Sequence, residues 1–251
     1  MVQGLDLTHL DQWIRDHVPP FEGDLKAEKF VGGQSNPTFK LSAGNNSYVL
    51  RRKPMGALLA SAHAVDREFK VLSALGPTNV PVPMPVALCE DDNVIGSMFY
   101  IMEYLEGRVF WDPALPEVSD EDRAAIYDQM NQVMADMHSV DIHRVGLRDY
   151  GKPGNYFERQ IGRWTKQYRA AETETISAME KLIDWLPRNI PADDSRVSLV
   201  HGDYRLDNMI FHPTEPRIIG VLDWELSTLG HPLADLAYQL MAWQFPHEAG
   251  I

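Results

Sequence analysis

The sequence is poor in three features that whole classes of proteins require. Among its 251 residues there is one cysteine, Cys89, which excludes an intrachain disulfide and a cysteine-based zinc site. Basic residues number 23 against 36 acidic ones, and the net charge of −13 argues against an extended nucleic-acid surface. No apolar run approaches the roughly 20 residues that span a bilayer, and the N-terminus has no apolar signal-peptide core. We expect a cytoplasmic protein without nucleic-acid or membrane partners.

The sequence also has no internal repeat, low-complexity tract or long linker, but its pattern changes near residue 105. Before that point EKFVGG, PTFKLSA and SYVLRRK predict strands, with GNN as a hairpin turn. One helix, AHAVDREFKVLSAL, interrupts them, and a second hairpin is expected to turn at residues 91–93. We therefore expect a first lobe, residues 1–104, with a small sheet and one main helix.

Residues 105–251 are expected to form a mainly helical second lobe. The predicted helices are SDEDRAAIYDQMNQVMADMHSV with Ser119 as N-cap, NYFERQIGRWTKQYRAAETE, ISAMEKLIDWL, and PLADLAYQLMAW, which begins near Pro232. Two short strands, NMIFH and RIIGVLDW, lie within this lobe and are separated by the turn PTEP.

A dense polar stretch, LVHGDYRLDN, precedes the first of these short strands. It contains His201, Asp203 and Asn208, and Asp223 follows at the end of the next strand, 20 residues after Asp203. Any one of these residues alone is most often a turn or cap residue, and Asp207, which could simply cap the turn, is not assigned to catalysis. A zinc role for His201 lacks suitably spaced partners, so we expect it to orient the loop backbone. Together, the carboxylates and the amide suit phosphoryl transfer, which needs a base and oxygen ligands for Mg²⁺.

This combination resembles the catalytic loop and metal-binding aspartate of the kinase fold, in the form found in the aminoglycoside phosphotransferase and choline kinase group. The resemblance implies an α+β, two-lobed, protein-kinase-like fold with a small antiparallel sheet in its first lobe. It also implies that Asp203 is the catalytic base and that Asn208 and Asp223 bind Mg²⁺ beside ATP.

The first lobe contains candidate nucleotide-binding parts in the order that this fold requires. Gly32, Gly33, Ser35 and Asn36 lie between two predicted strands, where backbone N–H groups can approach phosphates. Arg51 stands where protein kinases carry their phosphate-contacting lysine. The assignment could slip to a neighbour, but strand alternation turns Arg52 to the opposite face.

Two further elements complete the predicted nucleotide site. Glu68 matches the helix glutamate that pairs with the strand cation, although a solvated helix charge is the alternative. Glu103, Tyr104 and Leu105 match the hinge, where backbone groups recognise adenine. The Glu103 side chain could be an ordinary surface charge. The atoms that would contact adenine belong to the backbone in either case.

The segment after Asp223 favours a small acceptor over a peptide. Gly202 stands where protein kinases usually have an arginine, and a helix follows Asp223 too soon for a long activation segment. The resemblance implies that Asp235 supports the catalytic loop, whereas His231 replaces an aspartate of many relatives. Side chains expected to face the acceptor, or else to form a packed helix with solvated arginines, are Tyr156, Arg159, Arg163 and Trp164.

GKPGNYFERQIGRWTKQY and GHPLADLAY resemble the branch related to kinase-like domains fused to acyl-CoA dehydrogenases, over about residues 30–243. This implies ATP-dependent phosphorylation of a small-molecule hydroxyl, with a hydroxyacyl compound as a candidate acceptor. Relatives continue for several helices, so we expect either an incomplete acceptor site or a partner, such as a second copy, over Leu240, Met241 and Trp243. A nucleotide-binding pseudokinase or scaffold is the alternative function.

Overall fold

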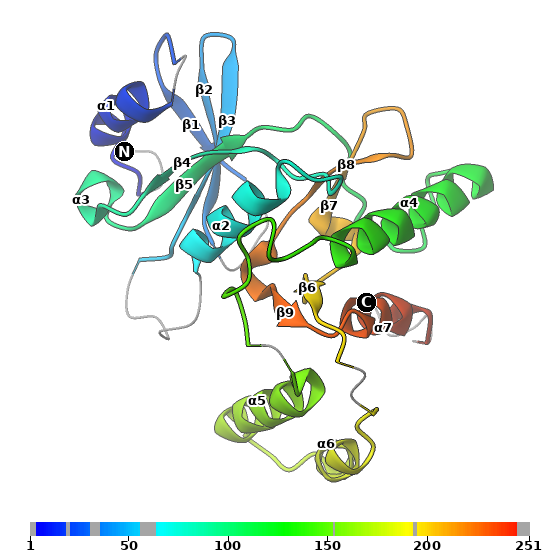
Figure 1. Cartoon of the computed structure of the whole chain (residues 1–251). Helices are drawn as coiled ribbons and strands as arrows, with labels where there is room; N and C mark the ends of the chain where they lie inside the picture. Colours follow the sequence, from blue (N-terminus) through cyan, green and yellow to red (C-terminus); the bar gives the residue numbers. More distant parts are fainter. Residues whose placement is uncertain are drawn as a thin grey trace.

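A computed structural model of the chain describes residues 4–18, 21–30, 36–55, 64–152, 154–192 and 195–244. Its fold is α+β with two lobes, a small antiparallel sheet with its helices and a mainly helical part (Figure 1). The predicted fold class is therefore confirmed. The sheet ends at Glu103, while the division of the chain between residues 104 and 105 stays a prediction.

Five strands form the sheet of the first lobe. They are β1 (Lys26–Lys29), β2 (Thr38–Ala43), β3 (Asn46–Arg52), β4 (Pro85–Cys89) and β5 (Phe99–Glu103). Their order is β1-β2-β3-β5-β4, and all neighbours are antiparallel. The predicted GNN turn joins β2 to β3, where Ala43 pairs with Asn46 and Gly44 has a φ of 55°.

Different helices cover the two faces of this sheet. The helices of the lobe are α1 (Leu7–His17), α2 (Val65–Leu75) and the single turn α3 (Asp92–Ile95). On one face Leu10 and Ile14 of α1 pack in a core cluster with Phe39. On the other face Leu72 of α2 packs in a cluster with Tyr100. Alternation along the strands therefore separates a structural face from the face that meets the second lobe.

The sequence predicted one helix in this lobe, and the structure has two more. Asp6 caps α1 by accepting the N–H of Thr8 at 3.0 Å. The predicted second hairpin is confirmed, because β4 pairs with β5, but the helical turn α3 makes the connection in place of the turn expected at residues 91–93. Asp91 accepts the N–H of Asn93 at 2.9 Å as N-cap, and Gly96 ends the turn with a φ of 84°.

In the residues that the structure describes, the second lobe combines four helices with two small strand pairs. The helices are α4 (Asp120–His138), α5 (Tyr156–Ala171), α6 (Ser177–Trp185) and α7 (Leu233–Met241), and the strands are β6 (Ser198–Val200), β7 (Met209–Phe211), β8 (Ile218–Val221) and β9 (Thr228–Gly230). Single 3-10 turns are η1 (Leu186–Arg188), η2 (Leu206–Asn208), η3 (Trp224–Leu226) and η4 (Ala242–Gln244). As predicted, Ser119 caps α4, with its hydroxyl accepting from Asp122 N–H at 3.1 Å. No helix in the described part of the chain is both long and apolar enough to cross a membrane.

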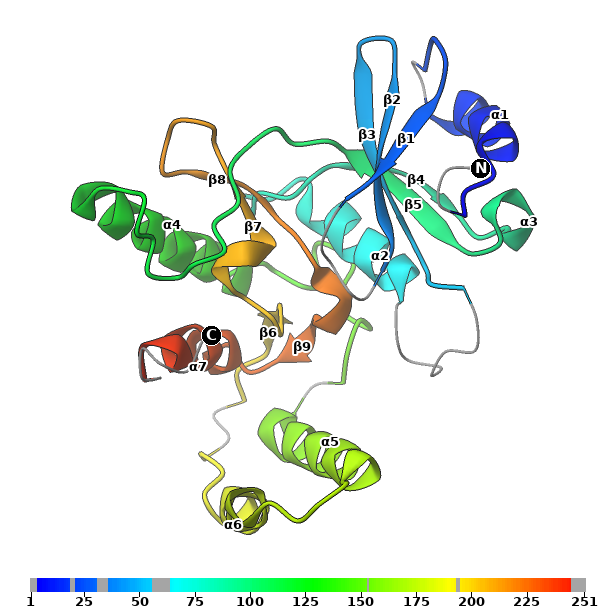
Figure 2. The same cartoon turned by 180° about the vertical axis from the view of Figure 1, so that it is seen from behind.

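The polar stretch LVHGDYRLDN connects the two strand pairs of the second lobe. β6 pairs with β9 and β7 pairs with β8, so residues 201–208 cross from one pair to the other. By contrast, α5 and α6 form an arm, residues 156–185, that stands apart from the rest of the second lobe (Figures 1 and 2). None of the described side chains of α5 and α6 is buried.

Candidate active site

The loop between β6 and β7 begins with a fully buried histidine. Nε2 of His201 donates to the backbone oxygen of Leu222 at 2.8 Å, and Nδ1 accepts from the backbone N–H of Asp203 at 3.2 Å. This pattern defines a neutral ring with its proton on Nε2. Burial lowers the pKa of His201, which favours the same form. Both ring nitrogens form hydrogen bonds with backbone groups, and through them His201 orients the loop.

A second set of hydrogen bonds comes from α7. The carboxylate of Asp235, which is buried, accepts the backbone N–H groups of His201 and Gly202, each at 2.9 Å. Nε2 of His138 lies 3.0 Å from the same carboxylate. Gly202 has a φ of 84°, and a Cβ there would lie 2.8 Å from the backbone oxygen of Leu226. The position therefore favours glycine over the arginine of protein kinases.

Asp203 is held by donors on both carboxylate oxygens. Nδ2 of Asn208 donates to Oδ2 and to the backbone oxygen of Asp203, each at 2.9 Å. The hydroxyl of Tyr238, from α7, donates to Oδ1 at 2.7 Å. Asp207 is used differently, since it pairs with Arg205. The structure thus brings Asp203 and Asn208 together and adds Tyr238 to them.

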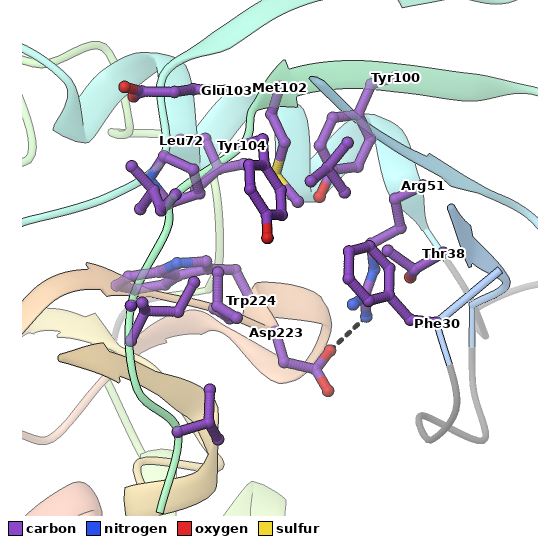
Figure 3. Close-up of a pocket in the computed structure, with 17 residues that line it drawn as sticks. Phe30, Thr38, Arg51, Leu72, Tyr100, Met102, Glu103, Tyr104, Asp223 and Trp224 are labelled. Atoms are coloured by element: carbon purple, nitrogen blue, oxygen red, sulfur yellow. Dashed lines mark hydrogen bonds and ion pairs between the residues drawn. The ribbon is translucent and has the colours of Figure 1, made fainter. Parts of the chain in front are cut away.

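Asp223 follows β8 and meets the predicted strand cation. Its φ of 63° lies in the left-handed region, where a non-glycine residue is strained. Its carboxylate pairs with Arg51 of β3, as the dashed line in Figure 3 marks. Nε of Arg51 also lies 2.9 Å from Oε2 of Glu68 on α2. The neighbouring Arg52 instead donates to the backbone oxygen of Gly4 at 3.2 Å, which agrees with the expected strand alternation.

Glu68 is the most deeply buried member of this group. Its side chain is 1% exposed, and it accepts hydrogen bonds from the hydroxyl of Tyr100 at 2.8 Å and from Nδ2 of Asn36 at 3.3 Å. Burial raises the pKa of Glu68 to about 7, against the opposing effect of Arg51. Glu68 is therefore a buried partner of the strand cation, and the alternative of a solvated helix charge is wrong.

The segment expected to hold phosphates is described only at its last residue. Gly32, Gly33 and Ser35 lie outside the described residues. Asn36 is buried, and besides Glu68 its Nδ2 donates to Oε2 of Glu225 at 3.1 Å. Asn36 therefore links the base of this segment to α2 and to the loop that follows Asp223.

A cavity of about 280 Å³ lies between the lobes beside these charges. Its apolar walls include Val49, Leu72, Met102, Ile210, Leu222 and Trp224. Glu103, Tyr104 and Leu105 also line it, and Figure 3 shows the Glu103 carboxylate pointing away from Asp223. Glu103 Oε2 accepts from the backbone N–H of Met84 at 3.3 Å. The Glu103 carboxylate is therefore occupied by a backbone hydrogen bond. An apolar cleft with a charged end suits a planar base that carries phosphates.

The charged end also has the ligand types that a hard cation prefers. One carboxylate oxygen each from Glu68, Asp223 and Glu225 lies within 4.8 Å of the others. Arg51 supplies one positive charge, and its Nη2 is 3.9 Å from Glu225. Three carboxylates around one guanidinium leave an excess of negative charge, which fits a divalent cation with oxygen ligands. The amide oxygen of Asn208, on the adjoining loop, is the same type of ligand.

The side chains expected to face the acceptor mostly contact residues within the arm or at its base. Arg159 donates to the backbone oxygen of Lys152 at 2.6 Å, and Arg163 lies over the ring of Trp164 at 5.6 Å. The ring of Tyr156 packs on Gly230, where a Cβ would lie 2.4 Å from it. Their role in acceptor binding stays a prediction.

Two residues of the site, Tyr238 and Glu225, were not predicted. Tyr238 lies three residues after Asp235, and this spacing places both on one face of a helix. Glu225 lies two residues after Asp223, in the sequence DWEL. Both spacings were visible, but the contacts with Asp203 and Asn36 depend on how distant elements pack.

Comparison with known proteins places the chain in one protein family. Residues 26–251 match the model of the phosphotransferase enzyme family. The chain is 48% identical over 245 residues to acyl-CoA dehydrogenase family member 11 of Rattus norvegicus, covering 96% of this chain and 32% of that protein. It is 51% identical over 224 residues to family member 10 of Mus musculus, covering 89% and 21%. The chain thus spans about a third or less of the length of these curated relatives.

Solved structures give the same result. A candidate aminoglycoside phosphotransferase of Ralstonia eutropha is 56% identical with a TM-score of 0.86, over 96% of this chain and 71% of that one. The ternary complex of streptomycin, ATP and the phosphotransferase APH(2")-IIa has 20% identity and a TM-score of 0.66, over 94% and 76%. The second likeness shows the fold alone. From the family match and the first structure it follows that this chain belongs to the phosphotransferase enzyme family.

Proposed function

We propose that the chain transfers the γ-phosphate of ATP to a hydroxyl group of a small molecule, with Mg²⁺ as cofactor. The observation that carries the proposal is the joining of two polar groups, because the backbone N–H of Leu222, next to Asp223, donates to the backbone oxygen of Asn208 at 2.8 Å. An aspartate with both oxygens held by donors lies on one loop, and the cluster of Arg51, Glu68 and Asp223 lies at the end of an apolar cavity. The ATP bound in a structural neighbour supports the nucleotide assignment.

The residues divide into nucleotide-binding and catalytic groups. We assign residues 1–104 to a nucleotide-binding lobe, in which Arg51 and the segment with Gly32, Gly33, Ser35 and Asn36 contact phosphates. Glu68 keeps Arg51 in place, and backbone groups of residues 103–105 bind adenine. Residues 105–251 form the catalytic lobe, where Asn208 and Asp223 would hold Mg²⁺. The ion would offset charge on the phosphates.

The transfer itself is an in-line displacement. The acceptor hydroxyl lies between Asp203 and the γ-phosphorus, and Asp203 receives its proton as the new oxygen–phosphorus bond forms. The bond from the γ-phosphorus to the bridging oxygen breaks, and ADP leaves. His201 and Asp235 hold the loop backbone in place, so that Asp203 needs little reorganisation during the step.

For the acceptor we propose a hydroxyacyl compound. The support is the similarity to acyl-CoA dehydrogenase family members 11 and 10, whose name refers to acyl compounds. An aminoglycoside, as in the structural neighbours, is the competing acceptor. Parallel assays with hydroxyacyl thioesters and with streptomycin separate the two.

The main test uses two substitutions with different expected effects. We expect Asp203→Asn to lower phosphate transfer by at least about 100-fold, since the base is lost, while the Kd of Mg·ATP in calorimetry stays within about twofold. Asp223→Ala is expected to weaken Mg·ATP binding at least about tenfold, because a metal ligand is removed. Asp207→Asn is the matched control in the same loop, and it should retain both activities.

Several outcomes would contradict the proposal. If Asp203→Asn removes nucleotide binding while the fold is intact, the division of roles between the two aspartates is wrong. If well-folded wild-type chain binds Mg·ATP but transfers no phosphate to any acceptor or to water, the catalytically silent alternative is favoured. If it does not bind Mg·ATP at all, the nucleotide site itself is wrong.

A further inference from the structure

Two side chains of α7 engage the catalytic loop from one face of the helix. Asp235 accepts the backbone N–H groups of His201 and Gly202 and so fixes the path of the loop. Tyr238, three residues later, acts on a side chain, because its hydroxyl donates to Oδ1 of Asp203 at 2.7 Å. One helix face therefore controls both the backbone and the reactive group of the loop.

The carboxylate of Asp203 needs such control, because the terminal torsion of an aspartate is broad and is not fixed by rotamer preference. Asn208 donates to Oδ2 and Tyr238 donates to Oδ1. Two donors on opposite oxygens remove the freedom of the carboxylate to rotate. Each oxygen still has a lone pair available, so the carboxylate remains able to accept a substrate hydroxyl.

The tyrosine itself is half-buried at a groove of the second lobe. Its ring lines a groove together with Trp111, Tyr127 and Trp243, and Arg205 lies at the same groove. Partial burial and the hydrogen bond to Asp203 raise the pKa of Tyr238, so its hydroxyl stays protonated and remains a donor at neutral pH.

We propose that Tyr238 is a positioning residue, whose hydroxyl orients the carboxylate of Asp203 toward the acceptor hydroxyl during phosphate transfer. This inference rests on the proposed function, since it assumes that Asp203 is the base. Tyr238 contributes no proton and forms no bond to the substrate. Its loss is expected to slow the chemical step and to leave nucleotide binding unchanged.

Tyr127 offers a matched control. It lines the same groove, and its hydroxyl also donates a hydrogen bond, but to the backbone oxygen of Pro113. Tyr127→Phe and Tyr238→Phe therefore remove the same atom from the same groove. Only the second substitution removes a contact with Asp203.

The test measures inorganic phosphate released from Mg·ATP with water as the acceptor, beside the Kd of Mg·ATP by calorimetry and the thermal midpoint. For Tyr238→Phe we expect kcat to fall about tenfold to 100-fold, as misplacement of a reacting group predicts. The KM and Kd of Mg·ATP should remain within about twofold. Tyr127→Phe should keep the wild-type kcat and Kd.

The outcomes separate this inference from the function on which it rests. Wild-type turnover by Tyr238→Phe, or an equal loss in Tyr127→Phe, overturns the role of Tyr238 alone. A parallel loss of Mg·ATP binding in Tyr238→Phe also overturns it, because a positioning residue for Asp203 should not move the Kd. A wild-type chain that binds no Mg·ATP, or that binds it and transfers phosphate neither to water nor to any acceptor, contradicts the proposed function and the role of Tyr238 with it.

Discussion

Two clusters of one arginine with carboxylates occur in different parts of the molecule. In the cleft cluster, Arg51 of β3 meets Glu68, Asp223 and Glu225. In the arm cluster, Arg169 of α5 meets Glu172 and Glu180 and so joins α5 to α6. The side chain of Arg51 is 13% exposed and that of Arg169 is 42% exposed. The chemistry is the same, and solvent access is the main difference.

That difference reverses the effect on the glutamates. Burial raises the pKa of Glu68 to about 7, whereas the hydrogen bonds from Arg169 lower the pKa of Glu180. A buried cluster pays desolvation that its ion pairs only partly offset, and an exposed cluster does not. Charged residues that are buried despite this cost are typical of functional sites. The exposed arm cluster only connects two helices at the surface.

The largest expected effect comes from removing the arginine of each cluster. Arg51→Met would leave three carboxylates close together without their cation. We expect the free energy of unfolding to fall by about 3–5 kcal/mol, as for other buried pairs that lose one partner. Mg·ATP binding should fall below detection in calorimetry. Urea unfolding of Arg51→Met, monitored by circular dichroism, provides the stability measurement.

Arg169→Met is the matched control for this experiment. Because the arm cluster is exposed, the unfolding midpoint of Arg169→Met should stay near the wild-type value, and this variant should bind Mg·ATP normally. Equal destabilisation by the two substitutions would remove the distinction between the clusters.

The pH dependence of stability should distinguish the two glutamates in a second way. Glu68 has a folded-state pKa of about 7 against an ordinary value of 4.5, so between these pH values the folded chain binds more protons than the unfolded chain. Its contribution to stability is therefore complete below about pH 4.5 and is lost as the pH rises through about 7. The slope for one proton is at most about 1.4 kcal/mol per pH unit.

Urea unfolding at intervals from about pH 5 to 7, without nucleotide or metal, measures this slope. Glu68→Gln should flatten the dependence relative to the wild-type chain. The pKa of Glu180 is lowered, so its contribution is present above the ordinary value of 4.5 and is lost only in more acidic solution. Glu180→Gln should leave the slope between pH 5 and 7 unchanged, and a flattened slope there would contradict the assignment to Glu68.

The parts of the candidate site that could be predicted from sequence depend on local rules. His201, Asp203 and Asn208 share one loop, and their spacing alone suggested a common site. Strand alternation separated Arg51 from Arg52, and the structure places these two arginines on opposite faces of the sheet. Local rules also predicted α4 and its Ser119 cap.

The parts that were missed depend on packing between distant elements. Tyr238 meets Asp203 only because α7 packs on the loop after β6, and Glu225 of the second lobe meets Asn36 of the first. The resemblance implied that Asp235 meets the loop, but the local sequence of α7 does not indicate that Tyr238 reaches the side chain of Asp203. The fold shows the same division, since α1 had a helical pattern that could have been recognised, whereas α3 depended on an N-cap at Asp91 within an expected turn.

The smallest expected effect compares two arginines that lie over aromatic rings. Arg67 of α2 lies 4.0 Å from the ring centroid of Tyr150, and its Nη2 donates to the backbone oxygen of Ser227 at 3.2 Å. These contacts tie α2 to the loop after Asp223. In the arm, Arg163 lies 5.6 Å from the ring of Trp164, which is 54% exposed.

Arg67→Met should therefore lower the free energy of unfolding by about 1–2 kcal/mol, through loss of a partly desolvated cation–π contact and a hydrogen bond. Arg163→Met should give no resolvable change in the same urea titration, since both its charge and its ring partner are exposed. The two variants remove the same group from a helix, so any difference reports the environment of the contact. Equal effects would mean that α2 gains no measurable stability from this tie.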